Sequence, residues 1–495
     1  MQNALSKETT KLAVSATREK FASEKYDAVV VGSGPNGLTA AILLLQRGFS
    51  VVVVEGQDTA GGGARSAELT LPGYVHDVCS AVHPMGYGSP IFRTLPLEKH
   101  GLEWIHPGAP YAHPFESGEA VVVHRSIEET AAQMGIDQGD YVRFMKGLVP
   151  GDWDQICEMI LAPYKALGHP VPLTRFGLAC IQPAKTLVDF TFRGQLAKGT
   201  FGGVAAHSAL KLTDIASASF GVVLGLAAHA VGWPIPRGGS QSITNALLSY
   251  MVSLGGELVL SAPVSSLGDL PDYRLLFFDL TPRQLLKILD GKIPTHYKNQ
   301  LQSYKYGPAA YKLDYALKGP IPWTAKGCRQ AGTVHLGGTF AEIAAAEDGN
   351  WHGVHSERPY MLLAQPSLFD DTRAPKGMHT AWTYCHMPNG SRVDMTEYME
   401  NQIERFAPGF RDLVVARTVT TPQQMEQKNN NYVGGDINGG ALTIEQLFTR
   451  PVLRANPYAT PIDGVYLCSS STPPGGAVHG MCGYYAVQVA LMGRK

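Results

Sequence analysis

Residues Tyr26–Glu55 read YDAVVVGSGPNGLTAAILLLQRGFSVVVVE, and this stretch decides the fold. An apolar, β-branched run at 28–31 predicts a buried strand, and a glycine-rich turn follows it directly. The next residues have the composition of a buried helix, which Gly48 can end. A second apolar run at 51–54 predicts another buried strand, closed by the carboxylate of Glu55. The order of strand, turn, helix, strand and acid is typical of a dinucleotide-binding unit.

Three glycines in the turn have separate physical roles. Gly32, Gly34 and Gly37 give the spacing G-x-G-x-x-G. The first permits the tight turn, the second lets a pyrophosphate approach the backbone, and the third lets helix and strand pack closely. The helix N-terminus offers unpaired N–H groups and a positive dipole end to the phosphates. Glu55 can accept from both ribose hydroxyls, and its charge disfavours the 2′-phosphate of NADP. The motif alone leaves both NAD and FAD open.

The composition describes a large chain with a substantial apolar core. Its 495 residues are enough for two or more domains, and 44% of them are apolar. The formal net charge of −1 argues against nucleic acid as the main partner, because phosphate binding requires a basic surface. The seven cysteines form no C-x-x-C pair. We therefore expect reduced thiols in a cytoplasmic protein rather than a disulfide framework, a structural zinc site or a redox dithiol.

Two segments bear on targeting and on membranes. Residues 1–25 are polar and lack the apolar run of a secretion signal, so we expect an N-terminal tail. The apolar stretch Ile215–Trp233 has no formal charge and is about long enough to span a bilayer. It is rich in Gly, Ala and Ser and lacks flanking basic clusters. We expect a helix buried beside a ligand cavity; a transmembrane helix is the alternative, and peripheral membrane contact stays open.

Features outside the first motif favour FAD over NAD. No second unit of strand, glycine turn, helix, strand and acid is visible, so a separate nicotinamide domain is not expected. A second glycine cluster at 61–63 follows Glu55 and would keep the backbone close to a long ligand. Near the C-terminus, Asp463–Leu491 predicts a strand, a Pro-Gly turn and a helix whose N-terminus points outward. Such a helix end stabilises negative charge on a reduced flavin.

Taken together, these motifs resemble the phytoene desaturase-like flavoproteins, which have the FAD fold of the glutathione-reductase type. The match runs almost end to end and includes VVVGSGPNGLTAA, GLAAHAVGWPIPRGGSQSITNAL, DLTPRQLL and YLCSSSTPPGGAVHGMCGY. The most similar branch is named phytoene dehydrogenase-related or pyridine nucleotide-disulfide oxidoreductase domain-containing. The resemblance implies an α/β fold, in which a Rossmann-type FAD-binding domain of glutathione-reductase type carries a mixed α+β substrate domain as a cap.

The resemblance and the changes of composition divide the chain into domains. The N-terminal tail takes residues 1–25. We expect the FAD-binding domain to be assembled from residues 26–105, 236–290 and 440–495. The substrate domain takes the two segments between them, residues 106–235 and 291–439.

The resemblance also implies contacts along the whole cofactor. At the pyrophosphate and the adenosine ribose it places Gly32, Ser33, Gly34, Asn36, Gly37 and Glu55. Close to the cofactor, near the phosphates or the ribityl chain, it places Gly61, Gly62, Arg65 and Ser66. The adenine would meet the backbone of Val264. At the ribityl-flavin end it places Ser470, Gly476, Ala477 and Val478.

No residue can be given a catalytic role from the sequence, but five side chains are candidates for the substrate pocket: His229, Trp233, Tyr384, His386 and His479. The first two lie in the apolar cap segment, where they could be a polar anchor and an aromatic wall. The next two alternate onto one face of a predicted strand, and the last begins the C-terminal helix. His207 is a similar case. For each, a place in the core is the alternative. No Ser-His-Asp order or cluster of metal ligands appears, so no metal is expected.

The predicted activity is FAD-dependent desaturation or saturation of a C–C bond in an apolar, isoprenoid- or lipid-like substrate, by hydride transfer at flavin N5. Oxygen or a quinone would then reset the flavin. Three alternatives stay open. They are redox-neutral isomerisation of a polyene on reduced FAD, amine oxidation on the shared fold, and FAD binding without turnover in an interaction protein. Some amine oxidases carry aromatic residues beside the flavin, where this chain reads Ser-Thr-Pro-Pro, and this disfavours amine oxidation.

Overall fold

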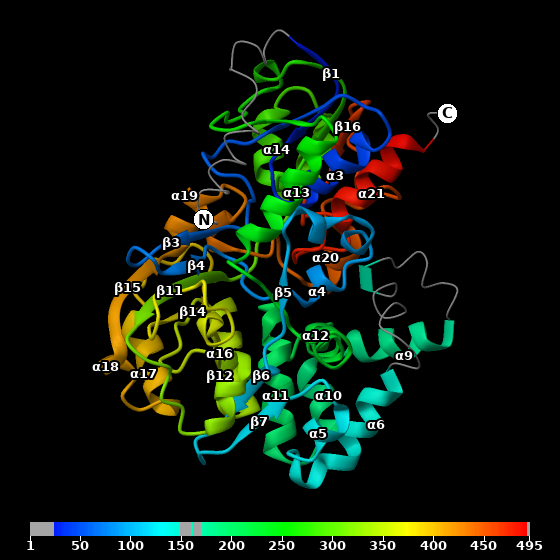
Figure 1. Cartoon of the computed structure of the whole chain (residues 1–495). Coiled ribbons are helices and arrows are strands. Elements are labelled where there is room, and N and C mark those ends of the chain that lie inside the picture. The colour runs from blue at the N-terminus through cyan, green and yellow to red at the C-terminus, as the bar shows by residue number, and fades with distance from the viewer. Residues whose placement is uncertain (1–23, 149–159, 162–169, 493–495) are drawn as a thin grey trace.

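Two β-sheets of different kinds form the framework of the molecule (Figure 1). The structure is a computed structural model that describes residues 24–148, 160–161 and 170–492. The predicted N-terminal tail, apart from its last two residues, lies outside the described residues. A five-stranded parallel sheet lies at the top of Figure 1, and a seven-stranded mixed sheet lies below it.

The parallel sheet has the order β16-β10-β1-β2-β9. Its strands are β16 (Val465–Leu467), β10 (Asp272–Phe278), β1 (Lys25–Val31), β2 (Val51–Val54) and β9 (Glu257–Val259). Every neighbouring pair is parallel. In open parallel sheets, ligands bind at the carboxyl ends of the strands, and the glycine-rich turn lies at that edge. All five strands come from the three segments predicted for the FAD-binding domain, with β1 beginning one residue early. The domain boundaries themselves stay predictions.

The larger sheet has the order β15-β11-β14-β13-β12-β6-β7. Its strands are β15 (Val414–Thr420), β11 (Ala309–Leu317), β14 (His379–Met387), β13 (Met361–Ala364), β12 (Ala331–Leu336), β6 (Ala109–Pro114) and β7 (Ala120–Val123). The β12–β6 pair is parallel and the other neighbouring pairs are antiparallel. Two small two-stranded sheets pair β3 (Ser66–Glu68) with β4 (Val75–Asp77) and β5 (Trp104–Ile105) with β8 (Ile235–Pro236).

The larger sheet has two chemically different faces, because successive side chains on a strand point to opposite sides. The outer face contributes Leu313, Val334 and Leu363 to an apolar core that also contains Met399 and Ile403 of helix α17 (Thr396–Phe406). The inner face instead carries histidines, aromatic rings and single polar groups. This inner face is the one that borders the candidate site described below.

The helices fall into two groups, those that cover the parallel sheet and those that lie elsewhere in the molecule. Those that share an apolar core with the parallel strands are α3 (Pro35–Leu45), α13 (Gln241–Ser253), α14 (Pro282–Ile288), α15 (Thr295–Gln302) and α21 (Met481–Leu491). The short helix α20 (Ile444–Thr449) precedes β16 in the chain. Both α13 and α21 pack against α3. The others are α4 (Pro84–Tyr87), α5 (Ile127–Ala131), α6 (Gln138–Leu148), α9 (Pro170–Cys180), α10 (Ala184–Thr191), α11 (Gln195–Ala205), α12 (Ala218–Ala230), α16 (Phe340–Trp351), α18 (Phe410–Leu413) and α19 (Pro422–Lys428).

The apolar stretch Ile215–Trp233 forms α12, which packs against α9 and α11. Apolar residues occupy all faces of this helix, and residues such as Val222 and Leu226 are buried. Across residues 24–148, 160–161 and 170–492, no helix is long and apolar enough to cross a membrane. The stretch is therefore a buried helix of 13 residues, as expected, and not the transmembrane alternative.

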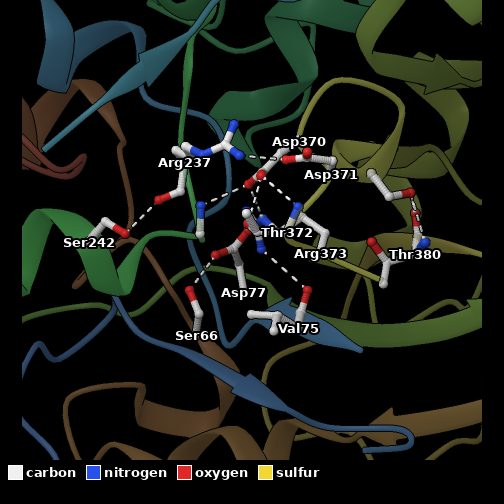
Figure 2. Close-up of polar contacts among 12 residues, drawn as sticks. Ser66, Val75, Asp77, Arg237, Ser242, Asp370, Asp371, Thr372, Arg373 and Thr380 are labelled. Atoms are coloured by element: carbon white, nitrogen blue, oxygen red, sulfur yellow. Dashed lines mark hydrogen bonds and ion pairs between the residues drawn. The ribbon is translucent and has the colours of Figure 1, made fainter. Parts of the chain in front are cut away.

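A buried ionic network joins the small sheet of β3 and β4, the loop between β13 and β14 and the residues before α13 (Figure 2). The guanidinium of Arg373 donates to Asp77 at the end of β4 over 2.8 Å and to Asp370 over 3.0 Å. All three side chains are fully buried. The two carboxylates also accept backbone N–H groups before α13, those of Ser240 at 2.7 Å and Gly238 at 2.8 Å. The network thus fixes the loop between β13 and β14 against the entrance to α13.

Candidate functional site

One long cavity runs from the carboxyl ends of the parallel strands to the inner face of the larger sheet. It encloses about 1940 Å³ of space free of protein atoms, part of which opens to solvent. Most of the residues predicted to contact the cofactor line it: Gly32, Ser33, Gly34, Asn36, Glu55, Gly62, Arg65, Val264, Ser470, Gly476, Ala477 and Val478. Residues more than four hundred positions apart thus share one cavity wall.

The glycine-rich turn forms a cradle at the N-terminus of α3. Gly32 has a φ of +101°, which favours glycine, and Gly34 is the extended residue before the helix. A Cβ on Gly37 would lie 2.2 Å from the carbonyl oxygen of Gly32, so only glycine permits this approach of helix and strand. Within the described residues, the buried Oδ1 of Asn36 has no hydrogen-bond partner. This oxygen is an acceptor, so the NH₂ of the Asn36 amide is the group that could donate to a phosphate.

The adenosine end of the cavity is marked by Glu55 and Val264. One carboxylate oxygen of Glu55 accepts from the N–H and the hydroxyl of Ser33, at 3.0 and 2.6 Å. The other accepts from the N–H of Gln57 at 2.9 Å. These bonds hold the carboxylate in place at the cavity wall. Oε2 accepts two of them and Oε1 one, so Oε1 keeps a lone pair for a ribose hydroxyl.

The loop after Glu55 contributes less directly. Gly61 does not line the cavity; its N–H donates to the hydroxyl of Ser33 at 3.1 Å and so supports the cradle. Arg65 lines the cavity, but its guanidinium donates to the Gly62 carbonyl at 2.9 Å and to two other loop groups. Ser66 lies outside the lining and donates to Asp77 at 2.7 Å, within the network of Figure 2.

The C-terminal motif supplies the far part of the cradle. Ser470 and the turn 476–478 line the cavity just before α21. His479 does not line it: its Nδ1 accepts from the N–H of Met481 at 3.0 Å, which caps the helix. Burial lowers the pKa of His479 to about 4, so its ring is neutral at physiological pH. His479 therefore serves the start of α21 in this structure.

The substrate end of the cavity is walled by aromatic, aliphatic and a few polar side chains: His207, Leu224, Trp233, Thr333, Leu362, Trp382 and Tyr384. Two of the five pocket candidates, Trp233 and Tyr384, are thus in the wall. His229 is held outside it by the hydroxyl of Tyr141, 2.8 Å from its Nε2. His386 points its Nδ1 at the buried carboxylate of Glu347, 3.0 Å from each oxygen.

Several residues at the site carried no assignment from the sequence. Asp279 directly follows β10, at the ligand edge of the parallel sheet, and that position is a usable signal. Trp382 lies two residues before Tyr384, so strand alternation predicts the same face. Thr333 and His335 belong to β12, whose place beside the cavity depends on long-range strand pairing.

Asp279 is an unusual neighbour for a phosphate cradle. Its Oδ2 accepts the N–H of Gly37 at 3.1 Å and would lie 2.4 Å from a Cβ on Gly34. Burial, reinforced by the charge of Glu55, raises the pKa of Asp279 to about 7 despite the bond from Gly37. A bound pyrophosphate would add negative charge nearby and favour the protonated acid.

The affinity for a dinucleotide is therefore expected to fall as the pH rises above 7. If only protonated Asp279 admits the ligand, the dissociation constant rises about fivefold between pH 7 and pH 8. Asp279→Asn stays neutral and keeps an acceptor for Gly37, so its affinity should be flat over this range. Titrations of both proteins at several pH values check this. Parallel pH profiles for the two proteins would contradict the assignment.

Known proteins with similar sequences cover nearly the whole chain. Residues 30–95 match the family model of an NAD(P)-binding Rossmann-like domain. The chain is 27% identical to pyridine nucleotide-disulfide oxidoreductase domain-containing protein 2 of Rattus norvegicus, over 95% of this chain and 94% of the rat protein. It is 24% identical to the neurosporene-forming phytoene desaturase of Rhodobacter capsulatus, over 92% of each.

Solved structures bear on the fold. Putrescine oxidase with bound putrescine superposes with a TM-score of 0.63 at 16% identity, over 95% of this chain and 99% of that one. The predicted fold class is confirmed: an α/β Rossmann FAD-binding domain with a mixed-sheet substrate domain. Over nearly its whole length the chain is similar to members of the phytoene desaturase-like family of FAD-dependent oxidoreductases.

Proposed function

We propose that this protein binds FAD and desaturates or saturates a C–C bond of an apolar, isoprenoid- or lipid-like molecule. The observation that carries the proposal is the continuity of the cavity, from the glycine cradle to a wall of aromatic and aliphatic side chains. A nucleotide alone would need only the cradle half. A flavin at the far end of FAD would reach the substrate half.

The residues present fit FAD. The cradle is closed to side chains by the neighbours of Gly34 and Gly37, and Asn36 lines it with an amide whose NH₂ can donate. The fixed carboxylate of Glu55 suits the ribose, and the turn 476–478 with the α21 N-terminus suits the flavin ring. When bound, FAD would supply hydride transfer at its N5. The protein would hold the substrate carbon in position and exclude water from it.

The substrate half suits an apolar ligand. Trp233 is buried against Tyr111, with ring centroids 4.7 Å apart, and so presents a rigid wall. Leu224 and Leu362 add aliphatic surface. Such a wall orients a flat polyene or an isoprenoid chain over a flavin. An oxygen or quinone acceptor, a cytoplasmic location and peripheral membrane contact stay predictions.

Amine oxidation is the second candidate, because the fold is shared with putrescine oxidase. Among the described residues that wall the substrate half, however, none carries a carboxylate that could pair with an ammonium group. Isomerisation of a polyene is compatible with the same cavity and differs only in its electron balance.

Anaerobic mixing distinguishes these functions. FAD-loaded protein is expected to lose its yellow flavin absorbance with a saturated or partly saturated isoprenoid, and to keep it with amines. Bleaching by amines alone would contradict the proposal. Conversion of a polyene only after dithionite reduction, without net electron transfer, would show the isomerase alternative instead. If nothing bleaches or converts, the non-catalytic alternative is favoured.

A further inference from the structure

Two polar side chains in the wall of the substrate half lack any partner in the described protein. The hydroxyl of Thr333 and the indole N–H of Trp382 are both buried without a hydrogen bond. Thr333 is 3% exposed and Trp382 is 8% exposed, and both residues line the cavity. A buried polar group without a partner costs about 1–3 kcal/mol, so such groups point to a ligand or to water.

The two groups lie in one row across the sheet. Thr333 of β12 pairs with Ala364 of β13, and Ala364 pairs with Trp382 of β14. Cross-strand partners point to the same face, and adjacent strands are about 4.8 Å apart. The two polar side chains therefore flank a small residue, with their backbones about 10 Å apart.

A pair of histidines adds a third group. Nε2 of His207 lies 2.9 Å from Nε2 of His335, which follows Thr333 by two residues on the same face. Burial lowers the pKa of His207 to about 3 and that of His335 well below its usual range. Both rings are therefore neutral, and each carries one N–H.

The hydrogen bond between the rings fixes which nitrogens carry hydrogen. Nδ1 of His335 is buried and has no partner among the described residues. A buried N–H without an acceptor is rare, so His335 carries its hydrogen on Nε2 and donates it to His207. The hydrogen of His207 then resides on its Nδ1. The ring of His207 lines the cavity, so this N–H is available to a ligand there.

We propose that the substrate half binds an apolar molecule with an acceptor oxygen, in a carbonyl, carboxyl or hydroxyl group, held by Thr333, Trp382 and His207. This deepens the proposed function and rests on its substrate cavity. An indole N–H is a donor only, so a hydrocarbon or an ammonium group would leave it unpaired.

Binding measurements on FAD-loaded protein test the proposal without turnover. The probes are four molecules with one farnesyl skeleton: farnesal, farnesol, farnesylamine and the hydrocarbon farnesene. Tryptophan fluorescence and the flavin spectrum report binding. The aldehyde and the alcohol are expected to bind at least about tenfold more tightly than the hydrocarbon and the amine. The geranylgeranyl series repeats the test at a greater chain length.

Two conservative variants locate the preference, and a third is the control. Trp382→Phe and Thr333→Val should each lower the affinity for the oxygen-bearing probes about five- to tenfold. The affinity for farnesene should stay within about twofold of that of the parent protein. Thr380→Val is the matched control. Thr380 lies on the same strand as Trp382 and its hydroxyl is also buried without a partner among the described residues, but it does not line the cavity. The Thr380→Val variant should bind all four probes with the affinity of the parent protein.

The outcomes separate this proposal from the proposed function. Equal binding of farnesene and farnesol, or an equal loss for all probes in the variants, overturns the acceptor-oxygen proposal alone. A fall in FAD content in the variants, with the probe preference unchanged, would show that these groups serve the cofactor and also overturns it. No binding of any probe in either series contradicts both the acceptor-oxygen proposal and the proposed apolar substrate.

Discussion

Replacing Arg373 with methionine is expected to lower the free energy of unfolding by about 3–5 kcal/mol. The substitution keeps much of the side-chain volume and removes the charge between Asp77 and Asp370. Both carboxylates are fully buried, so each would be left as an uncompensated charge or forced to take up a proton. The backbone N–H groups of Ser240 and Gly238 that bond to them cannot neutralise this charge.

Arg237→Met is the matched control for that loss. Arg237 lies in the same region of Figure 2 and pairs with Asp371 at 2.6 Å, but the Asp371 side chain is 82% exposed. Exposed pairs contribute about 0–1 kcal/mol, so this variant should unfold almost as the parent does. Urea unfolding followed by circular dichroism measures both. Equal midpoints for the two variants would show that the buried network contributes little.

Replacing Gly34 with valine is expected to weaken FAD binding at least about a hundredfold, or about 2.7 kcal/mol. The pyrophosphate must approach the backbone at this position, and a side chain there would fill the cradle. Even a Cβ would lie 2.4 Å from Oδ2 of Asp279, which is held by the N–H of Gly37. The three atoms nearest to that Cβ all belong to the carboxyl group of Asp279.

Gly139→Val controls for the loss of a glycine as such. A Cβ on Gly139, an exposed position in the first turn of α6, meets no atom within 4 Å. This variant should keep the FAD content of the parent. Circular dichroism of the FAD-free proteins shows whether Gly34→Val still folds. A folded Gly34→Val that retains FAD as the parent does would mean that the pyrophosphate does not lie at this turn.

The dinucleotide half could be predicted from the sequence because its pattern is local. Strand, turn, helix and acid are adjacent between Tyr26 and Glu55, and each has a preferred residue type. The structure has β1, α3 and β2 in that order. Ser66 shows that a residue next to a cavity-lining residue in the sequence need not line the cavity itself. It follows Arg65, which lines the cavity, but strand alternation in β3 turns it toward Asp77.

The substrate half could be predicted only in outline, because it depends on pairing between distant strands. Nothing in the sequence around Thr333 shows that it shares a row with Trp382, since that row requires the register through β13. His229 and His386 look alike as lone histidines in apolar segments. Their partners, Tyr141 and Glu347, lie 88 and 39 positions away in sequence. Those distant partners decide that neither histidine faces the cavity.

The central claim is that one cavity holds FAD at the cradle and leaves the aromatic half for an apolar substrate. The most direct measurement is a calorimetric titration of FAD-free protein with FAD, with NAD as the comparison. We predict one FAD per chain, bound far more tightly than NAD, and a yellow complex. A colourless protein that takes up no FAD, or one that binds NAD in preference, would contradict the account.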